Sequence, residues 1–289
     1  MERESFKEYS EKFLVYLKHE KDLSGYTLQS YEGDLAQLEH FWLTLEQAQQ
    51  KKIMSSHAIS SYERWLFGQK FSLASIARKC SCLATFNRFL LTQGVQGSFF
   101  IQRPFLAPKV PGSLHFSKLI TLFDELKNEQ LPTKYPYRDR ALIELLYATG
   151  ISSSELSLIM VEDIDFQEKT IAVYGSKKRV VLFGSQAYQK MLLYMHYERG
   201  SYCPLEPFFV NYKKGQLTAR SIQRICRMFG EVVGEKQKIT PMLFRNSFTL
   251  HLLAKGADTA LVKELLGYTT DISIEKYKHK KACPSIQKK

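Results

Sequence analysis

A cluster of glycines and prolines interrupts the chain after its first third, and no other feature constrains the fold as much. The cluster contains Gly94, Gly97, Pro104, Pro108, Pro111 and Gly112. This composition is typical of a linker, and prolines keep a linker extended and fairly stiff, so that it can hold two domains on opposite sides of a ligand. Since 289 residues are enough for two hydrophobic cores, we expect domains at 1–95 and 116–289, joined by a linker at 96–115.

The segment before the linker has the apolar spacing of helices and no strand pattern. Helices are expected at 56–67 and 72–91, among others. The second of these also carries three basic residues, Arg78, Lys79 and Arg88. A basic helix face of this kind is either solvated surface or a surface that contacts phosphates.

The segment after the linker predicts further helices and one small sheet. Helices are expected at 117–127, 137–147 and 153–159, and again from 185 onward. Two runs rich in β-branched residues, 170–174 and 179–183, are joined by a short turn with lysines at its tip, which is typical of a hairpin. The expected fold class is therefore mainly α with a small β-sheet.

The charge balance favours a polyanionic partner. Lys and Arg number 41 against 29 Asp and Glu, which leaves a net charge of +12. Basic side chains that neutralise phosphates release counterions, and this release drives association with nucleic acids. A basic but otherwise ordinary soluble protein has the same balance, so charge alone leaves both readings open.

Location and metal binding are indicated by what the sequence lacks. No apolar run approaches the ~18 residues that a membrane span needs, and the charged start Met1–Ser5 does not resemble a signal peptide. The five cysteines form no CxxC pair, which favours reduced thiols over disulfides or a zinc site. We expect a cytoplasmic protein that binds no metal and no membrane.

Three positions stand out for their chemistry. Lys177 lies on the hairpin turn, where it can reach a ligand, although lysines on such turns also serve solubility alone. Arg245 follows Pro241 among apolar residues, and a buried arginine needs an anion, either a phosphate or a carboxylate. Tyr277 is surrounded by cations in 274–281. We expect these cations to lower its pKa and attract a phosphate, unless it is simply a tyrosine on a basic helix.

Taken together and in this order, these features resemble tyrosine recombinases of the phage-integrase and Xer type. The matching segments are 24–27, 31–35, 75–79, 137–143, 146–150, 154–156, 208–211, 217–220, 251–258 and 265–267, followed by Tyr277. The resemblance implies an N-terminal helical core-binding (SAM-like) domain and a C-terminal tyrosine-recombinase catalytic domain. It also implies double-stranded DNA as the partner and strand exchange without a metal or cofactor.

In that family a tyrosine attacks a backbone phosphate to form a 3′-phosphotyrosyl link. Two arginines hold the phosphate oxygens, a lysine protonates the leaving oxygen, and histidines assist proton transfer. The resemblance assigns the nucleophile to Tyr277, the second arginine to Arg245, and the lysine to Lys177 or, since the turn is shorter than usual, Lys178. The residues expected to bind DNA are Arg78, Lys79 and Arg88 in the first domain and Arg220, Arg224 and Arg227 in the second.

Several positions depart from the family pattern. Ser152 stands where the first arginine is expected, Met242 and Tyr268 replace histidines, and Asn246 stands where a histidine is common. Loss of one donor to the transition state costs about 3–4 kcal/mol, or ~10²–10³ in rate. Cleavage is therefore expected to be impaired unless another cation replaces the missing arginine.

Two functions from different classes remain open. One is a site-specific recombinase or integrase that cleaves through Tyr277, with Arg140 or Arg179 in place of the missing cation. The other is a recombinase-fold protein that binds DNA without cutting it, as a regulator or accessory subunit. Either would assemble on DNA as a homotetramer or with a homologous recombinase, and would be encoded by a plasmid, a phage or a bacterial chromosome.

Overall fold

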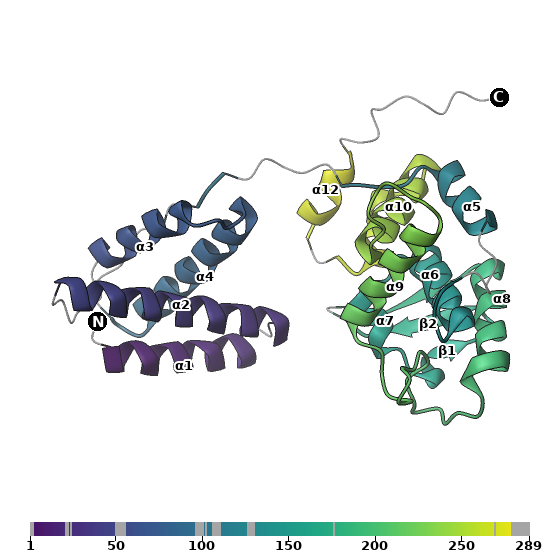
Figure 1. Ribbon diagram of the computed structural model, residues 1–289, viewed down its shortest axis with the longest axis horizontal. Coiled ribbons are helices and arrows are strands. Elements are labelled where there is room, and N and C mark those ends of the chain that lie inside the picture. Colours follow the sequence, from purple (N-terminus) through teal and green to yellow (C-terminus); the bar gives the residue numbers. More distant parts are fainter. Residues whose placement is uncertain are drawn as a thin grey trace. The chain divides into compact units, whose positions relative to one another are not determined.

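The computed structural model describes residues 3–20, 23, 25–49, 56–95, 101, 103–105, 111–125, 131–175, 177–268 and 270–278. The chain divides into two compact units, Met1–Ala107 and Pro108–Lys289, which are described separately (Figure 1). Much of the linker expected at 96–115 lies outside the described residues, so the limits of the two domains stay a prediction. No helix in the described ranges is long and apolar enough to cross a membrane.

Helices are the regular secondary structure of the first unit in its described residues. Its helices are α1 Arg3–His19, α2 Gly25–Gln49, α3 Ser56–Gly68 and α4 Leu73–Thr92. Phe6 and Phe13 of α1 both pack edge-on against Phe86 of α4, so aromatic rings fill the centre of the unit. Ser72 caps α4, because its side chain accepts a hydrogen bond from the Ser75 N–H at 3.1 Å. Both helices predicted in this region are confirmed to within one residue at each end.

The second unit combines helices with a small sheet. In the described ranges its elements are α5 Phe116–Glu125, α6 Pro136–Thr149, α7 Ser153–Leu158, β1 Ile164–Asp165, β2 Thr170–Val173, β3 Arg179–Leu182, α8 Ser185–Tyr194, α9 Ala219–Val232, α10 Pro241–Ala254, α11 Thr259–Leu266 and α12 Ile272–Lys278. The sheet is antiparallel in the order β1-β2-β3, with Ile171 opposite Val181. The hairpin of β2 and β3 confirms the prediction, whereas β1 is too short to give a sequence pattern.

Helix α6 forms the centre of the second unit. It contacts α8, α9, α10 and β3 (Figure 1), so even its charged residues are buried and must pair internally. Arg138 pairs with Asp139 and Arg140 pairs with Glu144, each at 2.7 Å. The helix ends at Gly150, which adopts a left-handed conformation with φ of 64°. The fold is thus mainly α with a small sheet, as the sequence predicted.

A smaller apolar cluster holds the C-terminal helix against this centre. It consists of Leu253, Val262, Leu266, Ile274 and Tyr277, all buried. Because these side chains come from α10, α11 and α12, the cluster fixes the position of Tyr277 relative to α10.

Candidate active site

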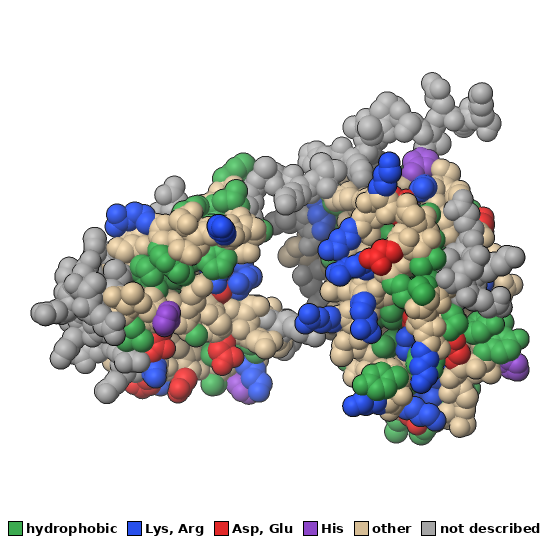
Figure 2. Space-filling model, in the orientation of Figure 1, with side chains coloured by type: hydrophobic (Ala, Val, Ile, Leu, Met, Phe, Trp, Pro, Cys, Tyr) green, Lys and Arg blue, Asp and Glu red, His purple; other side chains and the backbone are tan. Residues whose placement is uncertain are grey.

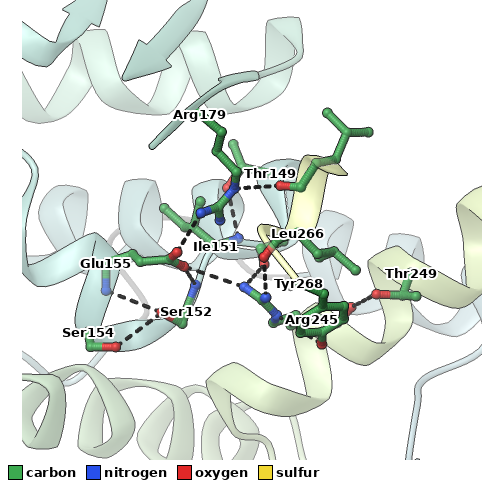
Figure 3. A network of polar contacts seen from close by, with 12 residues as sticks. Thr149, Ile151, Ser152, Ser154, Glu155, Arg179, Arg245, Thr249, Leu266 and Tyr268 are labelled. Atoms are coloured by element: carbon green, nitrogen blue, oxygen red, sulfur yellow. Dashed lines mark hydrogen bonds and ion pairs between the residues drawn. The ribbon is translucent and has the colours of Figure 1, made fainter. Parts of the chain in front are cut away.

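Arg245 lies near the start of α10 and is fixed by acceptors from other segments. Its Nη1 donates to the Gly150 carbonyl oxygen at 2.9 Å, and its Nη2 donates to the Leu266 carbonyl oxygen at 2.6 Å. Nη1 also lies 3.4 Å from Glu155 Oε2, and Nε lies 3.4 Å from the Tyr268 hydroxyl (Figure 3). The residue is only 6% exposed, so these contacts replace the water that a buried guanidinium loses.

Two glycines near this site have a left-handed backbone and no room for a side chain. Gly150 has φ of 64°, and a Cβ there would collide with the ring of Phe248. Gly267 has φ of 67°, and a Cβ there would lie 2.8 Å from Arg179 Nη1. Any side chain at either position is strained in its backbone and crowded in space.

Glu155 of α7 lies between Arg179 and Arg245. Its Oε1 is 2.5 Å from Arg179 Nη1, and its Oε2 is 3.4 Å from Arg245 Nη1 and accepts from the Ser152 N–H at 2.8 Å. Burial by itself raises the pKa of Glu155, but hydrogen bonds from Arg179 and Ser152 outweigh it and lower that pKa to about 2. The carboxylate is ionised at neutral pH, so Arg245 has a carboxylate partner before any phosphate arrives.

Ser152, at the predicted position of the first arginine, caps α7. Its hydroxyl accepts from the Glu155 N–H at 3.2 Å. Arg179 contacts Oε1 of Glu155, whereas Arg245 contacts Oε2. The Arg179 Nε donates to the Leu265 carbonyl oxygen at 2.7 Å. Arg140 belongs to another part of the unit, because it pairs with Glu144 in α6. Both arginines that the sequence offered as replacements are thus paired with carboxylates.

A hollow of about 360 Å³ opens beside Arg245. Its lining includes Ser152, Gln223, Arg227, Lys238, Met242 and Arg245. The replaced positions Ser152 and Met242 thus border the same space as Arg245. Met242 is 55% exposed, so its side chain lies largely in solvent and does not fill the hollow.

Tyr277 of α12 is completely buried, with 0% of its surface exposed. Its hydroxyl donates to Asn246 Oδ1 at 2.7 Å, and Asn246 Nδ2 donates to the Gly112 carbonyl oxygen at 2.9 Å. Burial, assisted by the neighbouring Tyr268, raises the pKa of Tyr277. The expectation that nearby cations lower this pKa is wrong, because burial dominates even though Lys276 Nζ lies 5.1 Å from the ring centroid.

Tyr268 shows the opposite shift. Burial raises its pKa, but the guanidinium of Arg245, whose Cζ lies 4.9 Å from the ring centroid, outweighs burial and lowers the pKa. Tyr268 is therefore the more acidic phenol of the pair, although it stands at a position where the family has a histidine.

The two hairpin lysines are both exposed. Lys178 Nζ lies 4.8 Å from the ring centroid of Tyr174, which keeps its ammonium on the surface of the turn. Lys177 is exposed beside it. The geometry of the turn does not favour either residue as the catalytic lysine, and the choice stays open.

The residues predicted to bind DNA differ in how available they are. The exposed ones are Arg78, Arg88, Arg220, Arg224 and Arg227. Lys79 is only 7% exposed and its Nζ lies 2.8 Å from Asp34 Oδ1. Arg78 binds both oxygens of the same carboxylate. Lys79 is therefore an internal ion-pair partner and not a surface contact for phosphate, which corrects its assignment. Figure 2 shows Lys and Arg side chains grouped over α7 and α9 in the second unit.

Sequence reasoning missed the central place of Glu155. A signal for it existed, because Ser152 and Glu155 have the spacing of a capping box, and both of its hydrogen bonds are present. The contact of Asn246 with Tyr277 had no comparable signal, nor had Lys238 at the hollow. These residues meet only through tertiary packing.

Known proteins resemble this chain over almost its full length. A model of the phage integrase family matches residues 113–283, and a model of the phage integrase N-terminal SAM-like domain matches residues 11–94. Tyrosine recombinase XerC of Anoxybacillus flavithermus is 35% identical over 277 residues, which cover 92% of this chain and 91% of that protein. XerC of Bacillus subtilis is 32% identical over 295 residues, which cover 96% and 93%.

Solved structures share the fold at lower identity. A XerH site-specific recombinase bound to palindromic difH substrate in a post-cleavage complex has a TM-score of 0.72 and 18% identity, covering 94% of this chain and 82% of that chain. A lambda integrase dimer bound to a COC′ core site has a TM-score of 0.70 and 13% identity, covering 98% of both. The family models and the XerC relatives together show that the chain belongs to the phage integrase family of tyrosine recombinases.

Proposed function

We propose that this protein binds duplex DNA and that Tyr277 cleaves one strand slowly, forming a 3′-phosphotyrosyl link. The observation that carries the proposal is the guanidinium of Arg245, held in place by Gly150, Glu155 and Leu266 at the edge of a hollow. A preorganised donor of this kind binds a phosphate oxygen without rearranging. The DNA-bound XerH and lambda integrase structures of the same fold support duplex DNA as the partner.

In this mechanism the phosphodiester enters the hollow with a nonbridging oxygen on Arg245. The Tyr277 hydroxyl leaves Asn246 and gives its proton to water, and its oxygen attacks the phosphorus, so that a new P–O bond forms as the bond to the 5′ oxygen breaks. The 5′ oxygen leaves and takes a proton from Lys177, or from Lys178 on the same turn. The step forms one P–O bond as another breaks and changes no oxidation state, so it needs no redox cofactor.

The reaction is slow for three reasons. Ser152 carries no charge, and loss of one transition-state donor costs ~10²–10³ in rate. Met242 neither donates nor accepts a proton at a useful pKa. Such effects are not additive, so their product overstates the loss. The raised pKa of the buried Tyr277 adds a further barrier before the phenol can attack.

A second candidate is a DNA-binding protein that does not cut. The complete burial of Tyr277 and its hydrogen bond to Asn246 favour it. Such a subunit would occupy one position of an assembly with a homologous recombinase, whereas the cleaving protein would act as a homotetramer. The mass of the complex that the wild-type protein forms on its target, measured with and without a complete homologue, distinguishes these two assemblies.

Action on cellular DNA implies a cytoplasmic location, and a plasmid origin stays a prediction.

A covalent-adduct assay separates the two candidates. The target is first selected from a random-sequence duplex pool and then made as a nicked suicide substrate. We expect slow adduct formation by the wild type and by Tyr212→Phe, a control at a 69% exposed tyrosine, and none by Tyr277→Phe. Tight binding without any adduct supports the protein that does not cut. Absence of duplex binding contradicts both candidates.

A further inference from the structure

The hollow beside Arg245 is bordered by more positive charge than the family assignment gives it. Arg245 and the replaced positions Ser152 and Met242 account for one side of its lining. Arg227 of α9 and Lys238, in the segment that precedes α10, line the same space. Neither residue belongs to the set that the resemblance assigned to catalysis.

Arg245 by itself has little left to offer an anion. A guanidinium has five N–H groups, and four hydrogen bonds already engage them, to Tyr268, Gly150, Glu155 and Leu266. One N–H on Nη2 stays free of these contacts. A phosphate in the hollow can therefore accept one hydrogen bond from Arg245, and its other oxygens need further donors.

The buried cluster behind the hollow also has little net charge. Arg179 and Arg245 bring two positive charges, and Glu155 cancels one of them. The excess of one positive charge matches a resting phosphodiester, but an attacking phenolate adds a second negative charge as the transition state forms. Charge that develops in a transition state is stabilised by fixed cations close by.

Arg227 and Lys238 are available to supply this positive charge. Both are exposed, and no side chain in the described ranges forms an ion pair or hydrogen bond with either. Glu235, the acidic residue near Lys238 in sequence, pairs instead with Lys118 at 3.3 Å. The short side chain of Ser152 leaves the hollow open between these two cations and Arg245.

We propose that Arg227 and Lys238 bind the same phosphate as Arg245 and replace the charge that the first arginine supplies in complete relatives. This inference rests on the proposed function, since the phosphate is one of the DNA backbone. It assigns Arg227 a second role beyond the general DNA-binding surface, because its neighbour Arg224 is exposed on the same helix but does not line the hollow.

The test uses inorganic phosphate as the probe and the full chain labelled with ¹⁵N-arginine. The dissociation constant for phosphate is read from the Arg245 Nε–H signal, which responds only to a ligand that reaches this site. We expect Arg227→Gln and Lys238→Gln each to weaken phosphate binding about tenfold, the range of one charge-assisted hydrogen bond. Arg227→Lys retains most of the affinity, and the control Arg224→Gln changes it less than about twofold.

A restoring variant sharpens the same test. In Ser152→Arg a new guanidinium enters the hollow. Arg227→Gln should therefore weaken phosphate binding less in the Ser152→Arg protein than it does in the wild type. Equal losses in Arg224→Gln and Arg227→Gln would mean that only the general surface charge matters, and would overturn the inference. No loss in Arg227→Gln, or no phosphate binding by the wild type, also overturns it. Failure of the proposed function is a separate result, seen as absence of duplex binding in a protein that still binds phosphate.

Discussion

Each unit contains a largely buried carboxylate between two basic side chains, but the two clusters differ in how they present their cations. In the first unit Asp34 pairs with Arg78 and Lys79, which are neighbours on α4. The Asp34 carboxylate forms ion pairs with both basic side chains, although the Arg78 side chain stays 43% exposed. The sequence pattern of a basic helix face therefore overstates the charge that this face presents to DNA.

In the second unit Glu155 lies between Arg179 of β3 and Arg245 of α10. Because three separate elements supply these residues, the cluster joins them and holds Arg245 at the edge of a hollow. The comparison teaches that a buried ion pair can either remove a cation from the surface or aim it at a ligand. The presence of an adjoining hollow decides which outcome applies.

The largest effect is expected from Glu155→Gln. Removal of this carboxylate leaves two buried guanidinium groups without their shared anion, so the free energy of unfolding should fall by about 3–5 kcal/mol. Chemical denaturation of the full chain measures this loss in the transition of the second unit. Glu168→Gln, at an exposed carboxylate, serves as the control and should change stability by less than about 0.5 kcal/mol. An equal effect in both variants would contradict the central role of Glu155.

Acid should remove the same stabilisation from the wild type. The pKa of Glu155 falls from 4.5 to about 2 on folding, so its contribution is fully present above pH 4.5 and is lost as the pH falls towards 2. The shift corresponds to about 3 kcal/mol. Unfolding free energies at pH 6, 4 and 2.5 should show the gap between wild type and Glu155→Gln closing as the pH falls. A gap that is independent of pH would show that Glu155 stabilises the unit in another way.

A smaller loss is expected from Asp34→Asn in the first unit. Lys79 becomes a buried and unpaired ammonium, but Arg78 can turn to water, so we expect about 2–3 kcal/mol, less than for Glu155→Gln. The measurement is again the free energy of unfolding, followed in the transition of the first unit. The comparison between the units breaks down if the loss in Asp34→Asn exceeds that in Glu155→Gln.

The smallest effect concerns DNA binding by the first unit. Arg88→Gln removes an exposed cation and should lower the salt dependence of duplex binding by about one counterion. Lys79→Gln should leave that slope unchanged, because Lys79 is occupied by Asp34. Duplex affinities from 50 to 200 mM salt measure both slopes. If Lys79→Gln flattens the slope as much as Arg88→Gln, the correction made for Lys79 is wrong.

Local signals in the sequence were enough for most of the fold. Ser72 as a cap and Gly150 as a helix stop both act within a few residues of chain, and the predicted helix ends beside them lie within two residues of the observed ones. The hairpin of β2 and β3 was found for the same reason. The π-helical turn Met195–Arg199 and the two-residue β1 were missed, because neither leaves a periodic pattern.

The electrostatics of the candidate site could not be predicted from the sequence. The order of motifs along the chain indicated Arg245 and Tyr277, and their catalytic roles stay a prediction. The pKa of Tyr277 was predicted in the wrong direction, because the lysines beside it in sequence matter less than the burial that α10 and α11 impose. The burial of Lys79 was missed for a similar reason, since its partner Asp34 lies on another helix. Side chains distant in sequence set the charge state of a site, and these become visible only in the folded chain.

The rate of adduct formation in Ser152→Arg tests the central claim most directly, namely that a phosphate is held at Arg245 in a site that lacks one cation. Single-turnover cleavage of the selected suicide substrate is compared between wild type, Ser152→Arg and the neutral control Ser152→Gln. We predict that Ser152→Arg alone raises the rate about tenfold to a hundredfold, less than the ~10²–10³ of a full donor, because Arg227 and Lys238 already supply charge. An unchanged rate in Ser152→Arg, with duplex binding intact, would contradict the account.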